Sequence, residues 1–358
     1  MDFGLSGEQI ALQDSINRFL DEQAGLEQLR ELVAGANQSR IWHGLADLGV
    51  TSLLLPEEFG GLGLGILEAT LVAECIGAHA TPTPFIGSAV LAPLALRHAD
   101  VAMQSKYLPK LLSGDVTVGV ALSEMAGARA DAGVNAKDGN LSGKAMFVLN
   151  PQADLTLVAS NEHSLYLVEN GAAGLQQLTQ TTIDRTRQSG ECRFAGTPAE
   201  LLTSDPAVAA GVLDTARVML VADTLGAAQH MLDSAVAYAK ERKQFGRVIG
   251  SFQAVKHLCA EMAAELEPCR AMMWYAAYAL DELPSEARLI ACHAKAHISE
   301  VGTFVARTAT EVHGGIGFTD LLGLHYWFKR IGFNRQTFGA PELIREEAAK
   351  LQALGTSV

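Results

Sequence analysis

The sequence predicts an α+β multidomain fold, with an N-terminal helical domain, a small middle β-domain and a C-terminal four-helix bundle. Long segments at both ends of the chain have apolar residues at helical spacing, and the composition is rich in Ala with few aromatics. Between them, short runs of Val, Leu and Phe are separated by Gly, Asn or Asp, which is typical of strands. A chain of 358 residues has room for two or three such domains. We expect their bounds to be 1–115, 116–204 and 205–358.

The N-terminal domain carries local signals for helix starts and turns. Ser6 is a candidate N-cap, and Gln9 stands at the capping-box position. The segment LLLPEEFGGLGLG has the Pro and Gly content of a turn, in which we expect Glu57 and Glu58 to be solvated. Apolar periodicity predicts further helices at 42–55, 67–79 and 92–112.

The remaining elements follow from the same patterns. Strands of the middle domain are expected at 116–122, 144–149, 154–159, 164–168 and 192–194. The Pro-flanked stretch 198–206 is the expected boundary to the C-terminal domain. Its four long helices are expected at 210–243, 252–280, 285–313 and 341–354. Such helices can form a bundle and also bury an oligomer interface.

Composition excludes several classes of function. The net charge of −13 argues against a nucleic-acid partner but leaves room for a nucleotide cofactor held by a few cations. The five cysteines are scattered and form no CxxC pair, which suits a reducing cytoplasm and predicts neither disulfides nor a metal site. His313 and His325 have no third ligand near them, so we expect ordinary helix-end histidines. We expect no signal peptide and no membrane span, and therefore a cytoplasmic protein.

The stretch AYAKERKQFGRVIGSFQAVKHLCAEM predicts two long helices broken at a single hinge, with Gly246 and Gly250 bracketing a short connector. Arg242, Lys243 and Gln244 place two cations and an amide beside free backbone N–H groups, an arrangement that suits a phosphate or pyrophosphate. The same cations are also favourable as solvated charges at a helix C-terminus, and spacing alone favours that interpretation.

The string RKQFG followed by IGSFQAVKH closely resembles the signature of the acyl-CoA dehydrogenase family. The resemblance implies that Arg242, Gln244 and Phe245 bind the pyrophosphate and adenine side of FAD across a subunit interface, and that Gln253 also contacts the flavin. WHGLADLGV followed by PEEFGGLGLG is similar to the family's N-terminal helical domain. The family layout of helices, a β-barrel-like middle and a helical bundle agrees with the elements predicted here.

The segment EVHGGIGF resembles the family's Gln-x-x-Gly-Gly-x-Gly turn. The resemblance implies that Gly314, Gly315 and Gly317 let the backbone approach a neighbour's FAD. Glu311 stands where the family prefers Gln. Its carboxylate can accept a hydrogen bond from an adenine amino group, but it cannot donate one and would repel a nearby phosphate.

Two segments of the middle domain resemble the family's flavin contacts. In ALSEMAGARAD, Ser123 and Glu124 fit the pattern, whereas Ala128 replaces the usual Gly and Arg129 the usual Ser. The guanidinium of Arg129 can substitute for the lost hydroxyl as an anion ligand. In GKAMFVLN, the places of the Trp-Ile-Thr that packs along the isoalloxazine are taken by Phe147, Val148 and Leu149. An ordinary buried strand is the other interpretation of these three residues, and the two have equal weight.

The family dehydrogenates an acyl-CoA thioester between its α and β carbons, and a Glu removes the α-proton. The TFGAP segment places Phe338 at the usual position of that Glu, and Ala216 stands at the position that other members use. Asp214 is two residues away, about 200° round the helix, and is better explained as a solvated acid or cap near a helix start. We therefore identify no catalytic residue.

Three hypotheses follow. In the first, the chain is a base-lacking subunit of a hetero-oligomeric acyl-CoA dehydrogenase, resembling the α2β2 enzymes of steroid and side-chain degradation. In the second, it forms a homo-oligomeric dehydrogenase, a dimer or tetramer, with Asp214 as a relocated base. In the third, it is a non-catalytic structural or regulatory homologue. For an active assembly, the resemblance implies FAD as cofactor, an acyl-CoA substrate and an electron-transferring flavoprotein as acceptor.

Overall fold

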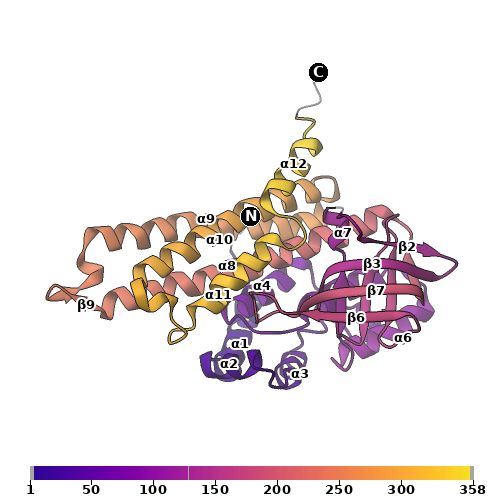
Figure 1. Ribbon diagram of the computed structural model, residues 1–358, viewed down its shortest axis with the longest axis horizontal. Coiled ribbons are helices and arrows are strands. Elements are labelled where there is room, and N and C mark those ends of the chain that lie inside the picture. The colour runs from indigo at the N-terminus through magenta and orange to yellow at the C-terminus, as the bar shows by residue number, and fades with distance from the viewer. Residues whose placement is uncertain (1–3, 128, 355–358) are drawn as a thin grey trace.

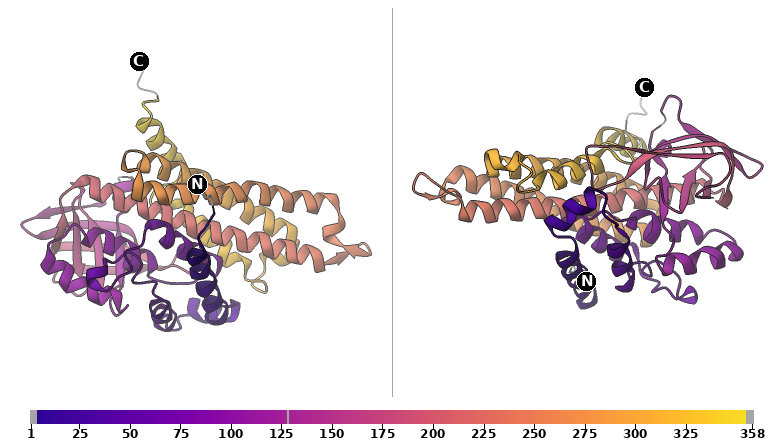
Figure 2. Two further views of the ribbon diagram at one scale, coloured as in Figure 1. Left: turned by 180° about the vertical axis from the view of Figure 1, so that it is seen from behind. Right: turned by 60° about the horizontal axis from the view of Figure 1, so that its bottom comes forward.

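The predicted three-part fold is confirmed in the computed structural model, which describes residues 4–127 and 129–354. Figure 1 shows long helices running along the molecule, a sheet at one end and the N-terminal helices below them. Both views of Figure 2 keep the sheet and the tip of a helical hairpin at opposite ends of the bundle. No helix in the described part of the chain is long and apolar enough to cross a bilayer.

The N-terminal helices confirm some local predictions and correct others. The predicted capping box of Ser6 and Gln9 is present, and Glu57 and Glu58 are exposed in a turn. The helix expected at 42–55 ends earlier because Gly49, with a φ of +84°, turns the chain. The helices of this part are α1 (Gly7–Gln23), α2 (Leu26–Val33), α3 (Ser39–Asp47), α4 (Ile66–Ala78), a π-helical turn (Ile86–Leu91), α5 (Ala92–Leu96) and α6 (Val101–Leu112).

The helix expected at 92–112 is two helices. The chain leaves α5 at Arg97, and α6 starts anew because the side chain of Asp100 accepts a hydrogen bond from the backbone N–H of Met103 at 2.8 Å. No apolar periodicity marks this break, which is set by one N-cap residue.

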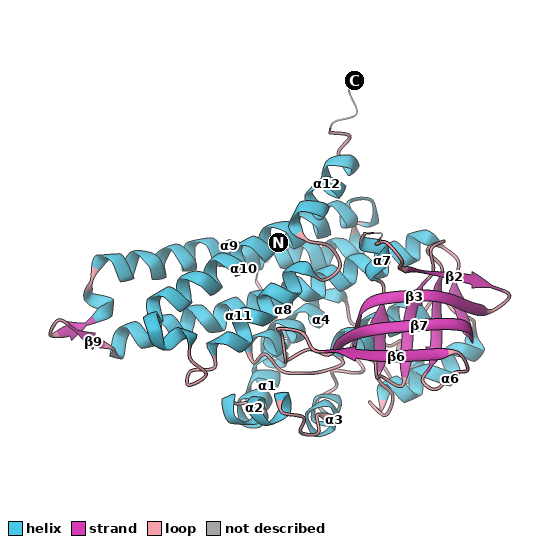
Figure 3. Ribbon diagram, in the orientation of Figure 1, coloured by secondary structure: helices cyan, strands magenta, loops and turns pink. Residues whose placement is uncertain are grey.

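The middle domain is one sheet with strand order β6-β7-β3-β1-β4-β5-β8, and β2 pairs with β3. Figure 3 shows β3, β7 and β6 crossing in front of the other strands, so that the sheet folds over its own core in a barrel-like manner. The predicted strands do not include β2, β6 and β8. Of these, β6 is largely polar and β8 is short, so neither shows a clear apolar pattern. The strands are β1 (Val118–Ala121), β2 (Gly133–Lys137), β3 (Asn140–Leu149), β4 (Leu155–Ala159), β5 (Leu165–Glu169), β6 (Leu175–Gln180), β7 (Ser189–Pro198) and β8 (Glu200–Thr203). A four-residue helix, α7 (Ser123–Ala126), follows β1.

The C-terminal part is the predicted bundle with one additional helix. α11 was missed because it starts at Gly323 without a side-chain cap and carries a glycine in its interior. α8 starts at Pro206, four residues before the predicted start, because Asp205 caps it. The helices are α8 (Pro206–Glu241), α9 (Gln253–Glu282), α10 (Pro284–His313), α11 (Leu324–Gln336) and α12 (Pro341–Leu351).

Backbones of the N-terminal part and the bundle meet directly where α4 crosses α8. A Cβ added to Gly226 would lie 1.9 Å from the carbonyl oxygen of Glu74, and one added to Gly77 would lie 2.0 Å from that of Asp223. Neither contact leaves room for a side chain. The two glycines therefore set the distance between these helices.

The predicted hinge between α8 and α9 is a complete reversal of the chain. β9 (Lys243–Gln244) and β10 (Arg247–Val248) form a small antiparallel hairpin. Phe245 and Gly246 connect them with φ values of +53° and +76°, as a tight two-residue turn requires. A short 3-10 turn, Ile249–Ser251, leads into α9. The reversal makes α8 and α9 antiparallel neighbours and leaves the hairpin at the tip of the bundle (Figure 1).

Candidate functional site

The two glycine-containing motifs of the C-terminal part meet at one open groove, which we call the hairpin groove. It has a volume of about 410 Å³. Its walls come from the end of α8, the hairpin and the turn that follows α10. The lining residues are Tyr238, Arg242, Gln244, Ile249, Val312, His313, Gly314, Gly315 and Ile316. The fold thus brings Arg242 and Gln244 beside Gly314 and Gly315, about 70 positions apart in the sequence.

Positive charge gathers at the hairpin although the chain as a whole is strongly acidic. Arg242, Lys243 and Arg247 are all exposed, and none forms an ion pair with another described residue. The guanidinium of Arg247 lies 4.0 Å from the centre of the Phe252 ring. The hairpin therefore offers unpaired cations to an anionic ligand.

Phe245 is the most exposed large apolar residue of the hairpin, with 92% of its surface accessible. Its ring meets the Phe252 ring edge-on, with 6.1 Å between centres. An apolar ring held in solvent at a turn can stack on a flat ligand or on a partner subunit.

The three glycines of the second motif, Gly314, Gly315 and Gly317, are under different structural constraints. A Cβ on Gly317 would lie 2.9 Å from the carbonyl oxygen of Thr310, so internal packing excludes a side chain there. Gly314 has a φ of +64°, which favours glycine on backbone grounds. Gly315 has neither constraint, because a Cβ there would meet no atom within 4 Å. A side chain at Gly315 would instead stand at the hairpin groove, where it would obstruct a ligand.

The floor of the hairpin groove is uncharged. The His313 ring stacks on Tyr238, with 4.7 Å between centres, and its Nδ1 lies 2.7 Å from the carbonyl oxygen of Ala309. Because a carbonyl only accepts, Nδ1 carries the proton. Burial lowers the pKa of His313, so the imidazole is neutral at pH 7. The cations of the hairpin are consequently the charged part of the site.

Two further predicted cofactor residues lie near the hairpin groove without lining it. Gln253 is exposed in the first turn of α9, and Glu311 is exposed in the last turn of α10, directly before the glycine motif. Within the described residues no three His, Cys, Asp or Glu side chains are grouped closely enough to hold a metal ion.

In the middle domain, the predicted flavin contacts are engaged with one another. The hydroxyl of Ser123 donates to the carbonyl oxygen of Phe147 at 3.4 Å, and Oε1 of Glu124 accepts from the backbone N–H of Met146 at 3.0 Å. Burial raises the pKa of Glu124. Phe147 sits at a register shift of β3 with a φ of +53°, and its side chain is 42% exposed. The guanidinium of Arg129 lies 4.9 Å from the centre of the Phe147 ring.

Val148 and Leu149 are buried strand residues, as the alternative interpretation expected. Their relative exposures are 0% and 4%, and both side chains belong to apolar clusters of the core. Their contact with a flavin stays a prediction, and of the three residues Phe147 is the one whose side chain is partly exposed. Ala128 lies outside the described residues.

Both expected positions of the catalytic Glu are closed. Phe338 and Ala216 are 2% and 0% exposed and pack in the main apolar core. The prediction of a solvated Asp214 is wrong, because α8 starts earlier than expected and this residue lies inside the helix at 3% exposure. Its carboxylate accepts a hydrogen bond from Nη1 of Arg217 at 2.9 Å. Burial raises the pKa of Asp214 to about 6, although Arg217 acts against the shift.

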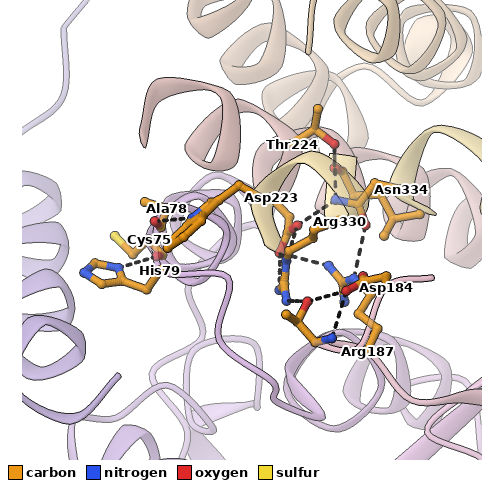
Figure 4. Close-up of polar contacts among 12 residues, drawn as sticks. Cys75, Ala78, His79, Asp184, Arg187, Asp223, Thr224, Arg330 and Asn334 are labelled. Carbon is orange, nitrogen blue, oxygen red and sulfur yellow. Dashed lines mark hydrogen bonds and ion pairs between the residues drawn. The ribbon is translucent and has the colours of Figure 1, made fainter. Parts of the chain in front are cut away.

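A buried ionic cluster, which no sequence pattern predicts, joins the middle domain to the bundle (Figure 4). Asp223 of α8 accepts hydrogen bonds from Arg330 at 2.7 Å and from Asn334 at 2.6 Å, both on α11. Arg187, in the loop before β7, forms an ion pair with Asp223 at 2.9 Å and donates to Asn334 at 3.1 Å. Burial alone would raise the pKa of Asp223, but the two arginines lower it to about 2. The partners lie too far apart in sequence for any spacing rule to connect them.

Comparison with known proteins points to one family. The family model for the acyl-CoA dehydrogenase N-terminal domain matches residues 6–115, and that for the C-terminal domain matches residues 207–352. Acyl-CoA dehydrogenase IpdE2 of Mycobacterium tuberculosis is 30% identical over 346 residues, which cover 94% of this chain and 95% of the relative. Its namesake in Mycolicibacterium smegmatis is 28% identical, covering 98% and 99% of the two chains.

Solved structures agree with this chain in fold. The ChsE4-ChsE5 complex from Mycobacterium tuberculosis matches with a TM-score of 0.90 and 26% identity over 100% of both chains. A variant of the Tcur3481-Tcur3483 steroid ACAD matches with a TM-score of 0.88 and 29% identity, covering 98% of this chain and 99% of the other. The similarity therefore extends over the whole chain.

Proposed function

Because the chain belongs to the acyl-CoA dehydrogenase family, we propose that it is a base-lacking subunit of a hetero-oligomeric, FAD-dependent acyl-CoA dehydrogenase. FAD is the cofactor of this family. In the proposal, the hairpin groove binds the pyrophosphate and adenine part of a flavin whose ring is held by a neighbouring subunit. One observation carries it: Arg242 and Gln244 share a groove with Gly314 and Gly315.

The chemistry of the hairpin groove fits that part of FAD. A pyrophosphate needs cations and amide donors, which Arg242 and Gln244 present in the groove and Lys243 presents beside it, without internal acidic partners. A ligand backbone also needs open space, and Gly315 leaves that space although nothing in the chain requires glycine there. Phe245 supplies an apolar ring beside these groups for the adenine or the partner.

When bound, FAD would supply the acceptor for a hydride from the β-carbon of an acyl-CoA, while a base removes the proton from the α-carbon. This chain contributes binding to that reaction and leaves the base to its partner. Phe338 has no proton-accepting group, and Asp214 is buried against Arg217. A carboxylate so enclosed has no path to the α-proton of a thioester.

Similar proteins support a homologous partner subunit. ChsE4-ChsE5 is a complex of two named proteins, and Tcur3481-Tcur3483 is described as a steroid ACAD. By analogy we assign this chain an acyl-CoA substrate whose acyl group derives from a steroid. Electrons would pass to an electron-transferring flavoprotein, as the family implies. A homo-oligomer with Asp214 as base has less support, because that carboxylate is inaccessible.

The experiment that tests the proposal compares the chain alone with the chain co-expressed with a homologous subunit that carries the Glu. FAD retention is measured after desalting, and flavin absorbance is followed anaerobically during titration with acyl-CoAs, steroid derivatives included. We expect no bleaching with the chain alone and bleaching with the pair. Bleaching of the isolated chain would establish that it carries its own base and would refute the proposal.

A matched pair of variants tests the hairpin groove itself. Arg242→Ala should lower the FAD content of the assembled pair, whereas Lys137→Ala, which removes an exposed cation from the middle domain, should not. Unchanged FAD content in the Arg242→Ala variant would show that Arg242 does not bind the pyrophosphate.

A further inference from the structure

Two buried cations hold the segment between α11 and α12, residues 337–340, which we call the connector. Arg217 of α8 donates from Nε to the carbonyl oxygen of Phe338 at 3.1 Å. Lys295 of α10 donates from Nζ to two carbonyl oxygens in the last turn of α11, directly before the connector. The two side chains are 0% and 1% exposed. The position of the connector therefore depends on bonds from two buried side chains to backbone oxygens.

The connector also has a strained backbone. Phe338 has a φ of +57°, where a residue with a Cβ is disfavoured. Gly339 follows with a φ of +111°, and a Cβ there would lie 2.6 Å from Cδ1 of Ile344. A strained segment keeps its conformation only while the surrounding contacts hold it. The connector is thus a place where the fold opens when those contacts weaken.

The helix that the connector leads into, α12, is attached to the rest of the chain over a small area. Ile344 and Ala348 of α12 form an apolar cluster with Cys292 and Ala296 of α10, and this cluster is separate from the main core. Figure 1 shows α12 projecting from the bundle. Because few buried contacts hold such a helix, it opens at a lower cost in free energy than the whole fold unfolds.

Lys295 is the one of the two cations without an acidic partner among the described residues. Acidic side chains on the helices packed around it bond to arginines instead: Asp214 and Glu347 to Arg217, Asp223 to Arg330, and Glu300 and Glu342 to Arg335. Burial lowers the pKa of Lys295 to about 7, and the charges of Arg217 and Arg335 act in the same direction. A proton is therefore taken up or lost inside the fold near neutral pH.

Other titratable groups beside the connector respond differently. Burial raises the pKa of Asp214 to about 6, so a proton on Asp214 favours the closed fold and acts below the pH range of Lys295. Burial raises the pKa of Cys292 to about 12, so its thiol stays protonated. His293 is exposed, and its ring lies 3.5 Å from Nε2 of Gln352, just past the end of α12. A variant of Lys295 separates the contribution of this histidine from that of the lysine.

We propose that the connector and α12 form an acid-sensitive latch with Lys295 as its sensor. A proton on Lys295 makes a buried cation, which water solvates better than two carbonyl oxygens do. Protonation therefore raises the population of an open state, in which the connector and α12 leave the bundle and water reaches Nζ. In that state Phe338 leaves the apolar core, and Glu347 leaves Arg217. The latch does not depend on the proposed flavin site, which lies at the hairpin.

Hydrogen exchange of the full chain, followed by mass spectrometry at about pH 6.5 and about pH 7.8, tests the latch after correction for the intrinsic pH dependence of exchange. A Lys295 pKa of about 7 in the closed state and about 10.4 in the open state gives roughly fivefold more opening of α12 at the lower pH. The amides of α12 should also exchange at least about tenfold faster than those of α4, which is buried and reports unfolding of the whole chain. Equal opening of α12 at both pH values, or exchange no faster than that of α4, overturns the inference.

A matched pair of lysine variants identifies the sensor. In Lys295→Met the opening of α12 should differ less than about twofold between the two pH values, because the titrating group is gone. Lys350→Met removes an exposed lysine of α12 that pairs with Glu346, and it should keep the roughly fivefold response. A response that persists in Lys295→Met would assign it to another group such as His293, and a response lost equally in both variants would assign it to net charge; either result overturns the inference. The wild-type comparison decides the inference by itself if Lys295→Met does not fold.

Discussion

The guanidinium of Arg217 donates from Nε to the carbonyl oxygen of Phe338 at 3.1 Å. This contact connects the two segments in which the family places its base, because Ala216 precedes Arg217 and Phe338 occupies the alternative position. Arg217 also donates to Glu347 at 2.8 Å and to Asp214 at 2.9 Å. A buried cation thus lies between the two positions at which the family resemblance expects the base, and the two carboxylates that it contacts, those of Asp214 and Glu347, are both hydrogen-bonded to it.

Asp214→Asn should leave turnover of the assembled enzyme within about threefold of wild type, because its carboxylate is paired and inaccessible. The free energy of unfolding should fall by about 1–3 kcal/mol, since Arg217 loses one of two acidic partners. Stopped-flow flavin reduction and urea denaturation measure the two effects. A decrease in turnover by several orders of magnitude would establish Asp214 as a relocated base.

Gly315→Ala should separate ligand binding from folding. The added methyl group meets no protein atom within 4 Å, so the midpoint of thermal unfolding should stay unchanged. FAD affinity should fall about tenfold, because the methyl group stands at the hairpin groove.

Gly317→Ala is the matched control for that variant. Its Cβ would lie 2.9 Å from the carbonyl oxygen of Thr310, so we expect a loss of about 1–3 kcal/mol in the free energy of unfolding. Retained ligand affinity in Gly315→Ala would show that the groove is not the contact surface.

Glu311→Gln should raise the affinity of the hairpin groove for FAD by about twofold to fivefold at low salt. The carboxylate lies in the last turn of α10, before the glycine motif, where its charge repels a pyrophosphate. The gain should shrink as ionic strength rises, because Glu311 is exposed and screened. Titrations at two salt concentrations measure it, and a loss of affinity would instead assign Glu311 a direct hydrogen bond to the adenine.

Lys295 should make folding stability increase with pH above neutrality. It is 1% exposed, and its Nζ donates to the carbonyl oxygens of Asn334 and Arg335 without an acidic partner. Burial lowers its pKa to about 7, and the charges of Arg217 and Arg335 act in the same direction. Above pH 7 the unfolded chain keeps a proton that the folded chain has lost, so the folded state gains by at most about 1.4 kcal/mol per pH unit.

Urea denaturation between pH 7 and about pH 7.8 measures that slope, in a range that stays below the ordinary cysteine pKa of about 8.5. Lys295→Met keeps the length of the side chain and should flatten the dependence. An equal slope in wild type and variant would show that Lys295 is not the group that titrates.

Prediction from sequence succeeded where the signal is local. Ser6 and Gln9 are three residues apart and form their capping box without help from the rest of the chain. The motifs around Arg242 and Gly314 were recognisable separately, but only the reversal at Phe245 and the antiparallel return of α10 bring them to one groove. Residue spacing does not connect these two motifs, whereas the resemblance to the family does.

Prediction from sequence failed where contacts between distant segments decide the burial of a residue. Apolar periodicity starts α8 four residues too late and so predicts a solvated Asp214, whereas the burial of Asp214 depends on its contact with Arg217, which also binds Glu347 of α12. The Asp223 cluster draws on Arg187, in a loop earlier in the chain, and on Arg330 of α11, which is 107 residues after Asp223. No period or propensity encodes such contacts.

The close crossing of α4 and α8 has a consequence for how the chain can be divided. Between Ala69 and Gly77 every residue of α4 is buried, and Gly77 meets the backbone of α8. A helix buried on all sides needs neighbours on all sides. Although a separate family model describes residues 6–115, we expect that segment, once excised, to expose α4 and to aggregate. We therefore expect the N-terminal part to need the bundle in order to fold.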